Sequence, residues 1–403
     1  MKRPLLLICL LALAAAPAAH AAPTMFIGAA EDAGRGNPTW AKAKMDLAQA
    51  AGFTAIRLTS IWTPGSRAPS KGELFALQSA SQAAALDGIR ILITVMPYGS
   101  STVPLTAKAR ADFAAYAATL VEKLPLVHDY IVGNEPNINR YWLPQFTPDG
   151  QDAAASTYEK MLAASYDAMK AVDPDVDVIG GSVSPRGGDD PTSSRQTHSP
   201  TMFIADLGDV YRASGRTKPI MDAFAFHPYG ERSRVPPTFT HPRSTTIGLG
   251  DYGKLVRLLG EAFDGTAQKG SKLPVIYDEY GVQSQIPRRK IGAYTNEDVP
   301  SARDAVPESL QSDYYRQAIL MAACQPNVKG LLIFHVTDEP DLDRWQSGVY
   351  YADDTPKSTL PVVKEAIAAA PAARCGSVPE SQSADEAKAF LRAVRRLLPN
   401  LPG

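Results

Sequence analysis

The chain has 403 residues, of which 45% are hydrophobic, and its 41 basic and 42 acidic residues leave a formal net charge of -1. A chain of this length and composition can bury a large core, and one barrel of about 250 residues or more fits within it. The near balance of charge gives no indication of a nucleic-acid partner.

The amino terminus is typical of a secretory signal over residues 1–21, because two cations precede an apolar stretch over 5–16 and a small-x-small cleavage site follows. We expect the mature chain to begin near Ala22 and to be secreted, either outside the cell or into a periplasm. A lipoprotein signal is the alternative, but Cys9 lies inside the apolar stretch, too early for an anchor cysteine. No other segment approaches the roughly 18 consecutive apolar residues of a membrane span, so we expect a soluble monomer without integral membrane contact.

Two cysteines, Cys324 and Cys375, remain after such processing. In an oxidising compartment they could form one disulfide that ties the last barrel helix to the tail. Two separate buried thiols are the alternative, because the sequence does not give the distance between them. The pairing therefore stays open.

Short apolar runs alternate with helical patterns along most of the chain. This alternation predicts a parallel sheet with right-handed crossovers, and eight units predict a closed (β/α)8 TIM barrel of the α/β class. An open sheet is less consistent, since no Gly-x-Gly-x-x-Gly phosphate loop occurs. The expected strands centre on residues 25–29, 55–59, 89–95, 130–133, 176–180, 223–227, 275–278 and 330–335.

Seven helices are expected between these strands. Gly52 and Gly88 follow the first two helices directly, where a left-handed helix terminus favours glycine. The predicted helices span residues 38–51, 74–87, 107–124, 153–172, 202–214, 252–263 and 309–323.

Four long stretches fit neither period, and each follows a strand. On a barrel they would build the face that carries the active site, so substrate choice is expected there. They cover residues 182–201, 229–250, 283–307 and 337–347. We expect a single catalytic domain with these long loops over residues 22–375. Residues 376–403 are expected to be a polar linker and a helical tail that docks on the barrel or is disordered, with contact to an anionic surface as the alternative.

Two glutamates end apolar, β-branched runs that are expected to be the fourth and seventh strands. Glu135 follows Ile131-Val132-Gly133-Asn134, and Glu279 follows Val275-Ile276-Tyr277-Asp278. In a parallel barrel both carboxyl groups would project into one pocket at the carboxyl ends of the strands. One such glutamate is more often solvated or paired with an arginine, whereas two together indicate the carboxyl pair that cleaves a glycosidic bond.

Residues near the two glutamates indicate different roles for them. Arg57, at the end of the second strand, would keep Glu279 ionised by charge pairing, and Tyr229 would donate to the same carboxylate. Arg57 as a purely structural ion-pair partner is the alternative. Glu135 has no obvious cationic partner in the sequence, and an ionised Glu279 nearby would favour its protonated form, as an acid requires. Asn134 would hydrogen-bond the sugar hydroxyl beside the anomeric carbon.

The Asn-Glu-Pro end of the fourth strand, the His-x-Tyr end of the sixth and the glutamate end of the seventh resemble clan A retaining glycoside hydrolases, the cellulase-like (β/α)8 group that contains families 5 and 39. The resemblance covers roughly residues 22–370, nearly the whole mature chain. It implies a covalent glycosyl-enzyme intermediate, net retention of configuration and a carbohydrate as the binding partner. The residues that it implies are Glu135 as acid/base, Glu279 as nucleophile, and Asn134, Arg57, His227 and Tyr229 in support.

Two strand ends depart from the family pattern. The eighth strand ends in Phe334-His335 where relatives commonly have a tryptophan, and the third ends in Met96-Pro97-Tyr98 without the histidine of many cellulase-like members. His335 is expected to contact substrate, and Trp345 to supply the missing stacking surface. Further aromatic residues follow the second and fourth strands and are expected to stack on sugar rings, with loop packing as the alternative for each: Trp62, Trp142 and Tyr141.

Other classes of function are alternatives. An enolase-type barrel needs metal-binding carboxylates at three neighbouring strand ends, and the third and fifth strands lack them. No metal site is expected, because the histidines show no His-x-His or His-Glu-x-x-His spacing, and no cofactor is expected either. A non-catalytic sugar-binding barrel and a transglycosylase with the same intermediate remain open.

Overall fold

The computed structural model describes residues 19–20, 25–296 and 304–375. Apart from positions 19 and 20, the predicted signal segment lies outside these residues, as do the predicted linker and tail over 376–403. No helix in the described part of the chain has the length and hydrophobicity needed to cross a membrane.

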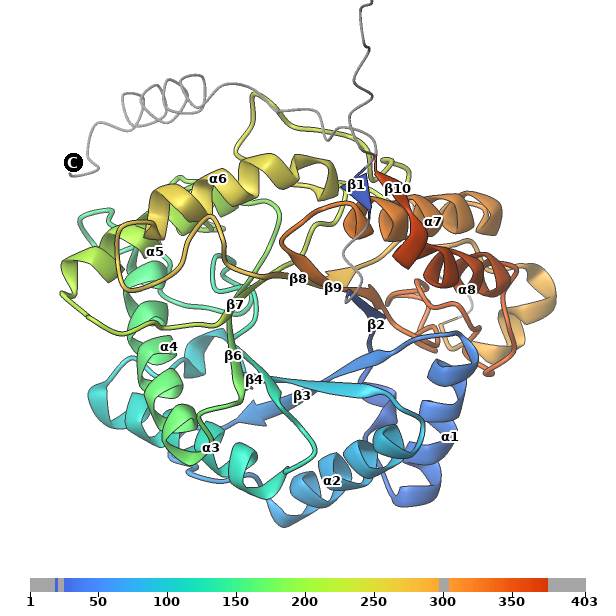
Figure 1. The fold of residues 1–403 in the computed structure, drawn as a ribbon, viewed down its shortest axis with the longest axis horizontal. Coiled ribbons are helices and arrows are strands. Elements are labelled where there is room, and N and C mark those ends of the chain that lie inside the picture. The colour runs from blue at the N-terminus through green and yellow to red at the C-terminus, as the bar shows by residue number, and fades with distance from the viewer. Residues whose placement is uncertain (1–18, 21–24, 297–303, 376–403) are drawn as a thin grey trace, which may run out of the picture.

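Eight parallel strands close into a barrel, and helices surround it (Figure 1). The strand order follows the chain, and the last strand pairs with the first. The predicted (β/α)8 class and all eight predicted strands are therefore confirmed. The strands are β2 (Phe26–Ala30), β3 (Ala55–Trp62), β4 (Arg90–Pro97), β5 (Asp129–Val132), β6 (Asp177–Val183), β7 (Ala223–Phe226), β8 (Val275–Tyr280) and β9 (Val328–Phe334).

The seven predicted helices are confirmed, and the structure adds an eighth, α8. This helix carries a proline in its first turn, a position that helices tolerate but that obscures the helical pattern in the sequence. Gly52 and Gly88 have φ of 86° and 67°, the left-handed conformation expected after α1 and α2. The helices are α1 (Pro38–Ala50), α2 (Lys71–Leu86), α3 (Ala107–Lys123), α4 (Ala153–Val172), α5 (Pro200–Ala213), α6 (Tyr252–Phe263), α7 (Glu308–Ala323) and α8 (Thr359–Ala369).

Apolar side chains pack on both faces of the barrel strands, one layer outside the barrel and one inside it. The larger cluster fills the space between the strands and the helices. A smaller cluster of short and branched side chains comes from strands around the barrel, as expected for a filled barrel interior. Its buried members are Ala55, Leu92, Ile131, Ile179, Ala223, Ala225, Ile276 and Leu332. Because the interior is filled, polar side chains can gather only at the ends of the barrel.

A disulfide joins Cys324, directly after α7, to Cys375 in the short strand β10 (Arg374–Cys375). The two Cα atoms are 5.3 Å apart, within the usual range of about 4.4–6.8 Å. The structure thus decides for pairing, although the helix involved is the seventh of the barrel and not the last. The strand β10 also pairs with β1 (Ala19–His20), which falls within the segment that the sequence predicts to be removed.

Candidate active site

Charged side chains from four barrel strands, or from the residues that follow them, meet at the carboxyl end of the barrel. Five of them form one hydrogen-bonded group: Arg57 of β3, Glu135 after β5, His227 after β7, and Asp278 and Glu279 of β8. Ser182 of β6 joins the group through its hydroxyl. Glu135 and Glu279 therefore lie in one site, as the strand assignment predicts.

Arg57 holds two consecutive carboxylates. Its Nη1 donates to Asp278 Oδ2 at 2.8 Å, and its Nη2 donates to Glu279 Oε1. Neighbours in a regular strand point to opposite faces, but the register of β8 against β9 shifts between Tyr277 and Tyr280, which accompanies this shared contact. Burial disfavours the charge on Arg57, yet Glu279 and Asp278 outweigh burial and raise its pKa above the usual value.

Tyr229 completes the environment of Glu279. Its hydroxyl donates to Glu279 Oε2 at 3.0 Å, so one oxygen of the carboxylate faces the guanidinium and the other faces the phenol. Burial and the charge of Glu279 both raise the pKa of Tyr229, which keeps the phenol protonated and able to donate. The predicted partners of Glu279 are thus in place around it.

His227 lies between the carboxylates and is completely buried. Its Nδ1 is 3.0 Å from Glu135 Oε1 and 3.5 Å from Glu279 Oε2, while its Nε2 is 3.3 Å from Asp278 Oδ2. Burial alone would lower the pKa of His227, but the charges of Glu279 and Asp278 and the hydrogen bonds to Asp278 and Glu135 raise it to about 10. The imidazole is therefore a cation at neutral pH, and the expectation that Glu135 has no cationic partner is wrong.

Asp278 is a functional residue that the sequence reasoning missed. It is fully buried and accepts from Arg57 Nη1 and from the Ser182 hydroxyl, each at 2.8 Å. Burial would raise the pKa of Asp278, but His227, Arg57 and the Ser182 hydroxyl lower it to about 2. The sequence did contain one indication of this role, because Asp278 directly precedes Glu279 at the end of a strand. Two adjacent carboxylates at a buried strand end need positively charged partners.

Glu135 lies in a tight turn after β5. Its φ of 39° is in the left-handed region, as is the φ of 51° at Ser182. The Glu135 N–H donates to the Ser182 carbonyl oxygen at 2.8 Å, which ties the turn after β5 to strand β6. Such conformations cost about 1–3 kcal/mol each and persist where the surroundings hold them, commonly at active sites. Asn134, directly before Glu135, is buried, and its contact with a sugar hydroxyl stays a prediction.

Two of the expected stacking residues are not in the site. Trp62 is fully buried beside Phe113 and its Nε1 donates to the Ser66 carbonyl. Trp142 is 1% exposed and its Nε1 donates to Thr157 Oγ1. The prediction that these two tryptophans stack on sugar rings is wrong, because both side chains are buried in the protein.

Other aromatic residues do adjoin the glutamates. Trp345 is half-buried and packs on Tyr229 and Phe334, with ring centroids 5.4 and 5.3 Å apart. Tyr141 is half-buried, and burial together with the charges of Glu135 and Glu279 raises its pKa to about 12. Stacking of Trp345 on a sugar stays a prediction. The structure places its ring next to Tyr229, which hydrogen-bonds Glu279.

A cavity of about 500 Å³ opens beside Arg57, at the ends of β2, β3 and β9. Phe334 and His335 line it, so His335 lies where the substrate contact was predicted, although the contact itself stays a prediction. Trp40, which is 49% exposed, also lines the cavity and was missed. It lies in α1 and not at a strand end, so the strand-end pattern gave no signal for it.

No protein-family model matches the sequence, and no curated protein matches it either. Solved structures do match. A family 39 glycoside hydrolase from Bacteroides cellulosilyticus has 18% identity and a TM-score of 0.61 over 86% of this chain. The chain spans 64% of the length of that enzyme. Its fold is that of family 39 and family 5 glycoside hydrolases.

Two further structures support this likeness. A family 5 enzyme from Bifidobacterium longum, solved with Manβ1-4GlcNAc, has 12% identity and a TM-score of 0.55, with 85% of this chain and 78% of that chain covered. A monomeric β-xylosidase from Caulobacter crescentus has 15% identity and a TM-score of 0.53, with 86% and 69% covered. The predicted resemblance to families 5 and 39 is confirmed at the level of the fold.

Proposed function

We propose that the protein is a retaining glycoside hydrolase, with Glu279 as nucleophile and Glu135 as acid/base. The observation that carries the proposal is that one nitrogen, His227 Nδ1, contacts an oxygen of both glutamates. These contacts, at 3.0 and 3.5 Å, bring the two carboxyl groups to one hydrogen-bond partner. Such close placement supports the roughly 5–5.5 Å separation of retaining enzymes over the roughly 6.5–9.5 Å of inverting enzymes.

The partners of each carboxyl support the two roles. Arg57 and Tyr229 each hydrogen-bond one oxygen of Glu279 and so orient the carboxylate that attacks the anomeric carbon. Glu135 transfers its proton to the leaving oxygen as the glycosidic bond breaks. In the second step Glu135 takes a proton from water, the water oxygen attacks the anomeric carbon, and the bond to Glu279 breaks.

Two cations, Arg57 and His227, face three carboxyl groups in this site. With Asp278 and Glu279 ionised, the charges of the group balance when Glu135 carries its proton. This balance supports Glu135 as the acid of the first step. His227 Nδ1 can then keep a donor directed at Glu279 while Glu135 gives up or takes a proton.

The substrate that we propose is a β-linked glycoside. The names of the similar structures support this class, since they include β-xylosidases, an exo-β-1,4-mannosidase and a β-glucuronidase. We also propose that the protein is secreted, because the predicted signal segment agrees with the Cys324–Cys375 disulfide, a feature of oxidising compartments.

Hydrolysis of a panel of aryl β-glycosides and polysaccharides tests this proposal. Glu279→Ala should lower kcat by at least about a thousandfold, because no other group can form the covalent intermediate. Glu365→Ala, an exposed glutamate of α8, is the matched control and should keep wild-type turnover. NMR of the first-formed product should show the substrate's anomeric configuration. Unchanged turnover in Glu279→Ala would contradict the mechanism, and inverted product would contradict retention.

A further inference from the structure

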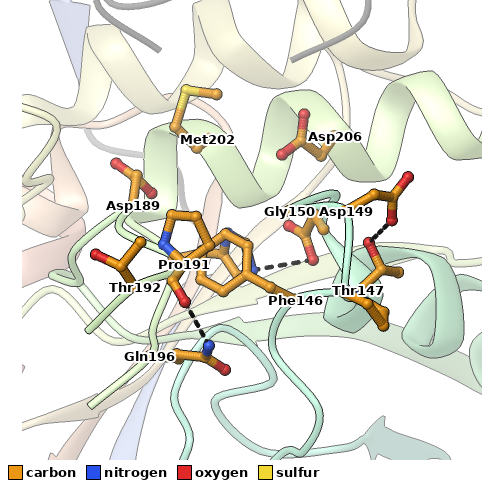
Figure 2. A pocket seen from close by; sticks show the side chains of 13 residues that line it. Phe146, Thr147, Asp149, Gly150, Asp189, Pro191, Thr192, Gln196, Met202 and Asp206 are labelled. Atoms are coloured by element: carbon orange, nitrogen blue, oxygen red, sulfur yellow. Dashed lines mark hydrogen bonds and ion pairs between the residues drawn. The ribbon is translucent and has the colours of Figure 1, made fainter. Parts of the chain in front are cut away.

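A second cavity, of about 440 Å³, lies away from the two glutamates and between two loops (Figure 2). One wall is the loop before α4, and the other is the loop before α5 together with the first turns of that helix. Four aspartates line it, and no lysine or arginine is among the described residues of its lining. These aspartates are Asp149, Asp152, Asp189 and Asp206. A cavity with this lining favours a cation.

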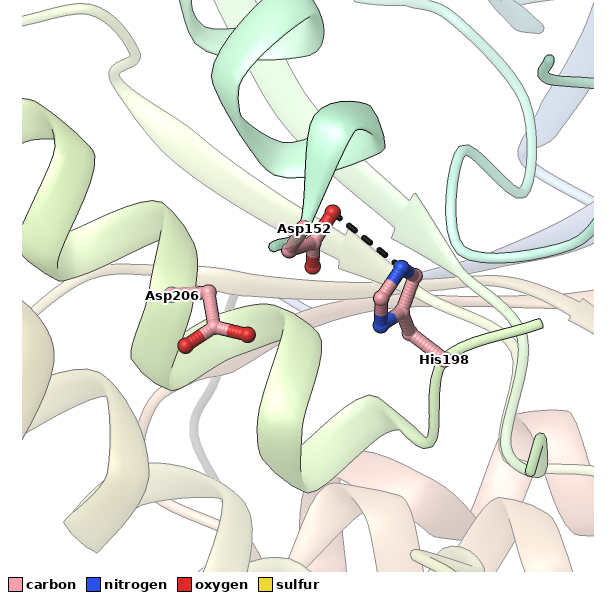
Figure 3. A group of neighbouring side chains, drawn as sticks. All are labelled: Asp152, His198 and Asp206. Atoms are coloured by element: carbon pink, nitrogen blue, oxygen red, sulfur yellow. Dashed lines mark ion pairs between the residues drawn. The ribbon is translucent and has the colours of Figure 1, made fainter. Parts of the chain in front are cut away.

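Three side chains converge in this cavity: Asp152, His198 and Asp206 (Figure 3). One potential ligand atom from each lies within 4.8 Å of the other two. Metal bonds to imidazole nitrogen and carboxylate oxygen are about 2.0–2.2 Å long, so two ligands of one tetrahedral ion lie roughly 3.4 Å apart and the three side chains would move toward one another around a bound ion. Asp152 caps α4, whereas His198 lies just before α5 and Asp206 lies within it, so the three residues form no short sequence motif.

Asp152 has a buried oxygen without a partner. Its side chain is 4% exposed, and Oδ1 accepts from the Ala155 N–H at 2.7 Å as the N-cap of α4. Oδ2 is buried and makes no hydrogen bond. A buried carboxylate oxygen without a donor is costly unless a cation or another donor satisfies it. This oxygen is therefore an independent indication that a positive ligand belongs here.

His198 is oriented as metal-bound histidines usually are. Its Nε2 lies 2.8 Å from the Gln145 carbonyl oxygen and 3.2 Å from Asp152 Oδ1, two acceptors, so Nε2 carries the hydrogen. The neutral ring then presents a lone pair at Nδ1, and Figure 3 shows that nitrogen turned toward Asp206. A ring N–H donated to a backbone carbonyl is the usual support of a histidine ligand.

We propose that Asp152, His198 and Asp206 bind one divalent transition-metal ion, of the zinc or manganese class, with its remaining positions open to the cavity. One imidazole nitrogen and two carboxylate oxygens suit such ions. Calcium and magnesium prefer an all-oxygen set, so the histidine disfavours them.

The proposed ion would stabilise the loop that carries Glu135. The backbone N–H of His198 donates to the Asn137 carbonyl oxygen at 2.9 Å, and the Asn137 side-chain amide donates to the His198 carbonyl oxygen at 3.0 Å. Asn137 lies two residues after Glu135 in the same turn. The ion would thus stabilise the packing of α4, α5 and this turn against one another. This effect does not depend on which reaction the glutamates perform.

Calorimetric titration of the EDTA-treated protein with Zn²⁺, Mn²⁺ and Ca²⁺ tests the site, together with the Tm at each ion concentration. We expect Zn²⁺ or Mn²⁺ to bind at one ion per chain and to raise the Tm by about 2 °C or more at saturation. Binding of Ca²⁺ alone, or no stoichiometric binding by any of the three ions, would overturn the proposal.

Two charge-removing variants locate the ion. Asp152→Asn keeps a good N-cap acceptor for α4 and so should remain folded. Asp206→Asn makes the matching change on α5, and Asp209→Asn on the exposed face of that helix is the control. We expect Asp152→Asn and Asp206→Asn to weaken Zn²⁺ or Mn²⁺ binding by more than about tenfold. Substituting even a residue that only supports a metal ligand typically lowers metal affinity by about 10–100-fold. Binding equal to that of the control would overturn the assignment.

Discussion

Glu279 and Glu135 are held in opposite ways. Glu279 belongs to a barrel strand, and its cation comes from another strand of the same barrel. Glu135 lies beyond its strand in a left-handed turn, which is fixed by a hydrogen bond to Ser182 and by its contact with His227. The barrel itself therefore positions one carboxyl group, while a turn held by contacts to the ends of two other strands positions the other.

This difference separates two kinds of vulnerability. Changes near Glu279 act on a buried charge network that also stabilises the barrel, so their effects on activity and on folding are coupled. Changes near Glu135 act on a turn, so they should alter the reaction with little effect on stability. Each of the following experiments tests one side of this comparison.

After Glu279→Ala, the largest expected effect is on the acid. Glu135→Ala should lower kcat/KM by about 10²–10⁴-fold on a substrate with a poor leaving group, the usual contribution of general acid catalysis. A glycoside with a dinitrophenyl leaving group needs little proton donation, so its bond cleavage should be affected much less. Kinetics on matched substrates with the two leaving groups measure this split. Equal losses on both would contradict the acid role.

Asp278→Asn should damage folding and turnover together. Removing this carboxylate leaves Arg57 and His227 buried with one partner fewer, which should cost about 3–5 kcal/mol of unfolding free energy. We expect kcat to fall by roughly tenfold or more, since Arg57 then orients Glu279 less well. Urea unfolding and steady-state kinetics measure the two effects.

The control for Asp278→Asn is Asp251→Asn, which removes a buried carboxylate paired with His241 on another loop. It should lower stability and leave kcat near the wild-type value. If both variants show the same kcat, Asp278 has only a structural role.

His227 should make stability fall at alkaline pH. Its pKa is raised from 6.5 to about 10, so the charged ring contributes its full stabilisation below about pH 6.5 and loses it as the pH rises through 10. Between these limits the wild type should lose at least about 2 kcal/mol relative to His227→Gln, since one pKa unit corresponds to about 1.4 kcal/mol. Urea unfolding of both proteins from pH 6.5 to 10 gives the difference. Parallel curves would show that the ring is not a buried cation.

Asp278 should act at the other end of the scale. Its pKa is lowered from 3.8 to about 2, so its contribution is present above about pH 3.8 and is lost as the pH falls through 2. Unfolding of wild type and Asp278→Asn below pH 4 should therefore converge. Curves that stay apart down to pH 2 would contradict the lowered pKa.

The same contrast explains what could be predicted from the sequence. Strand periodicity defines the barrel, and with it the strand ends that carry Arg57 and Glu279, so that half of the site was predictable. The positive charge of His227 was not, because it arises from Glu279 and Asp278, which only the fold brings beside the ring. Trp62 and Trp142 were misassigned for a related reason, since position near a strand end does not reveal which way a ring turns.

The smallest effect is expected at Trp345. Its substitution tests whether the loops around the barrel end, and not only the barrel strands, contribute to substrate affinity. Stacking on a sugar ring contributes about 0.5–1.5 kcal/mol, so Trp345→Ala should raise KM by up to roughly tenfold and change kcat little. Trp345→Phe keeps an aromatic face against Tyr229 and should recover most of the loss. A fall in kcat with unchanged KM would instead mean that Trp345 serves to hold Tyr229 against Glu279, which would place it on the barrel side of the comparison.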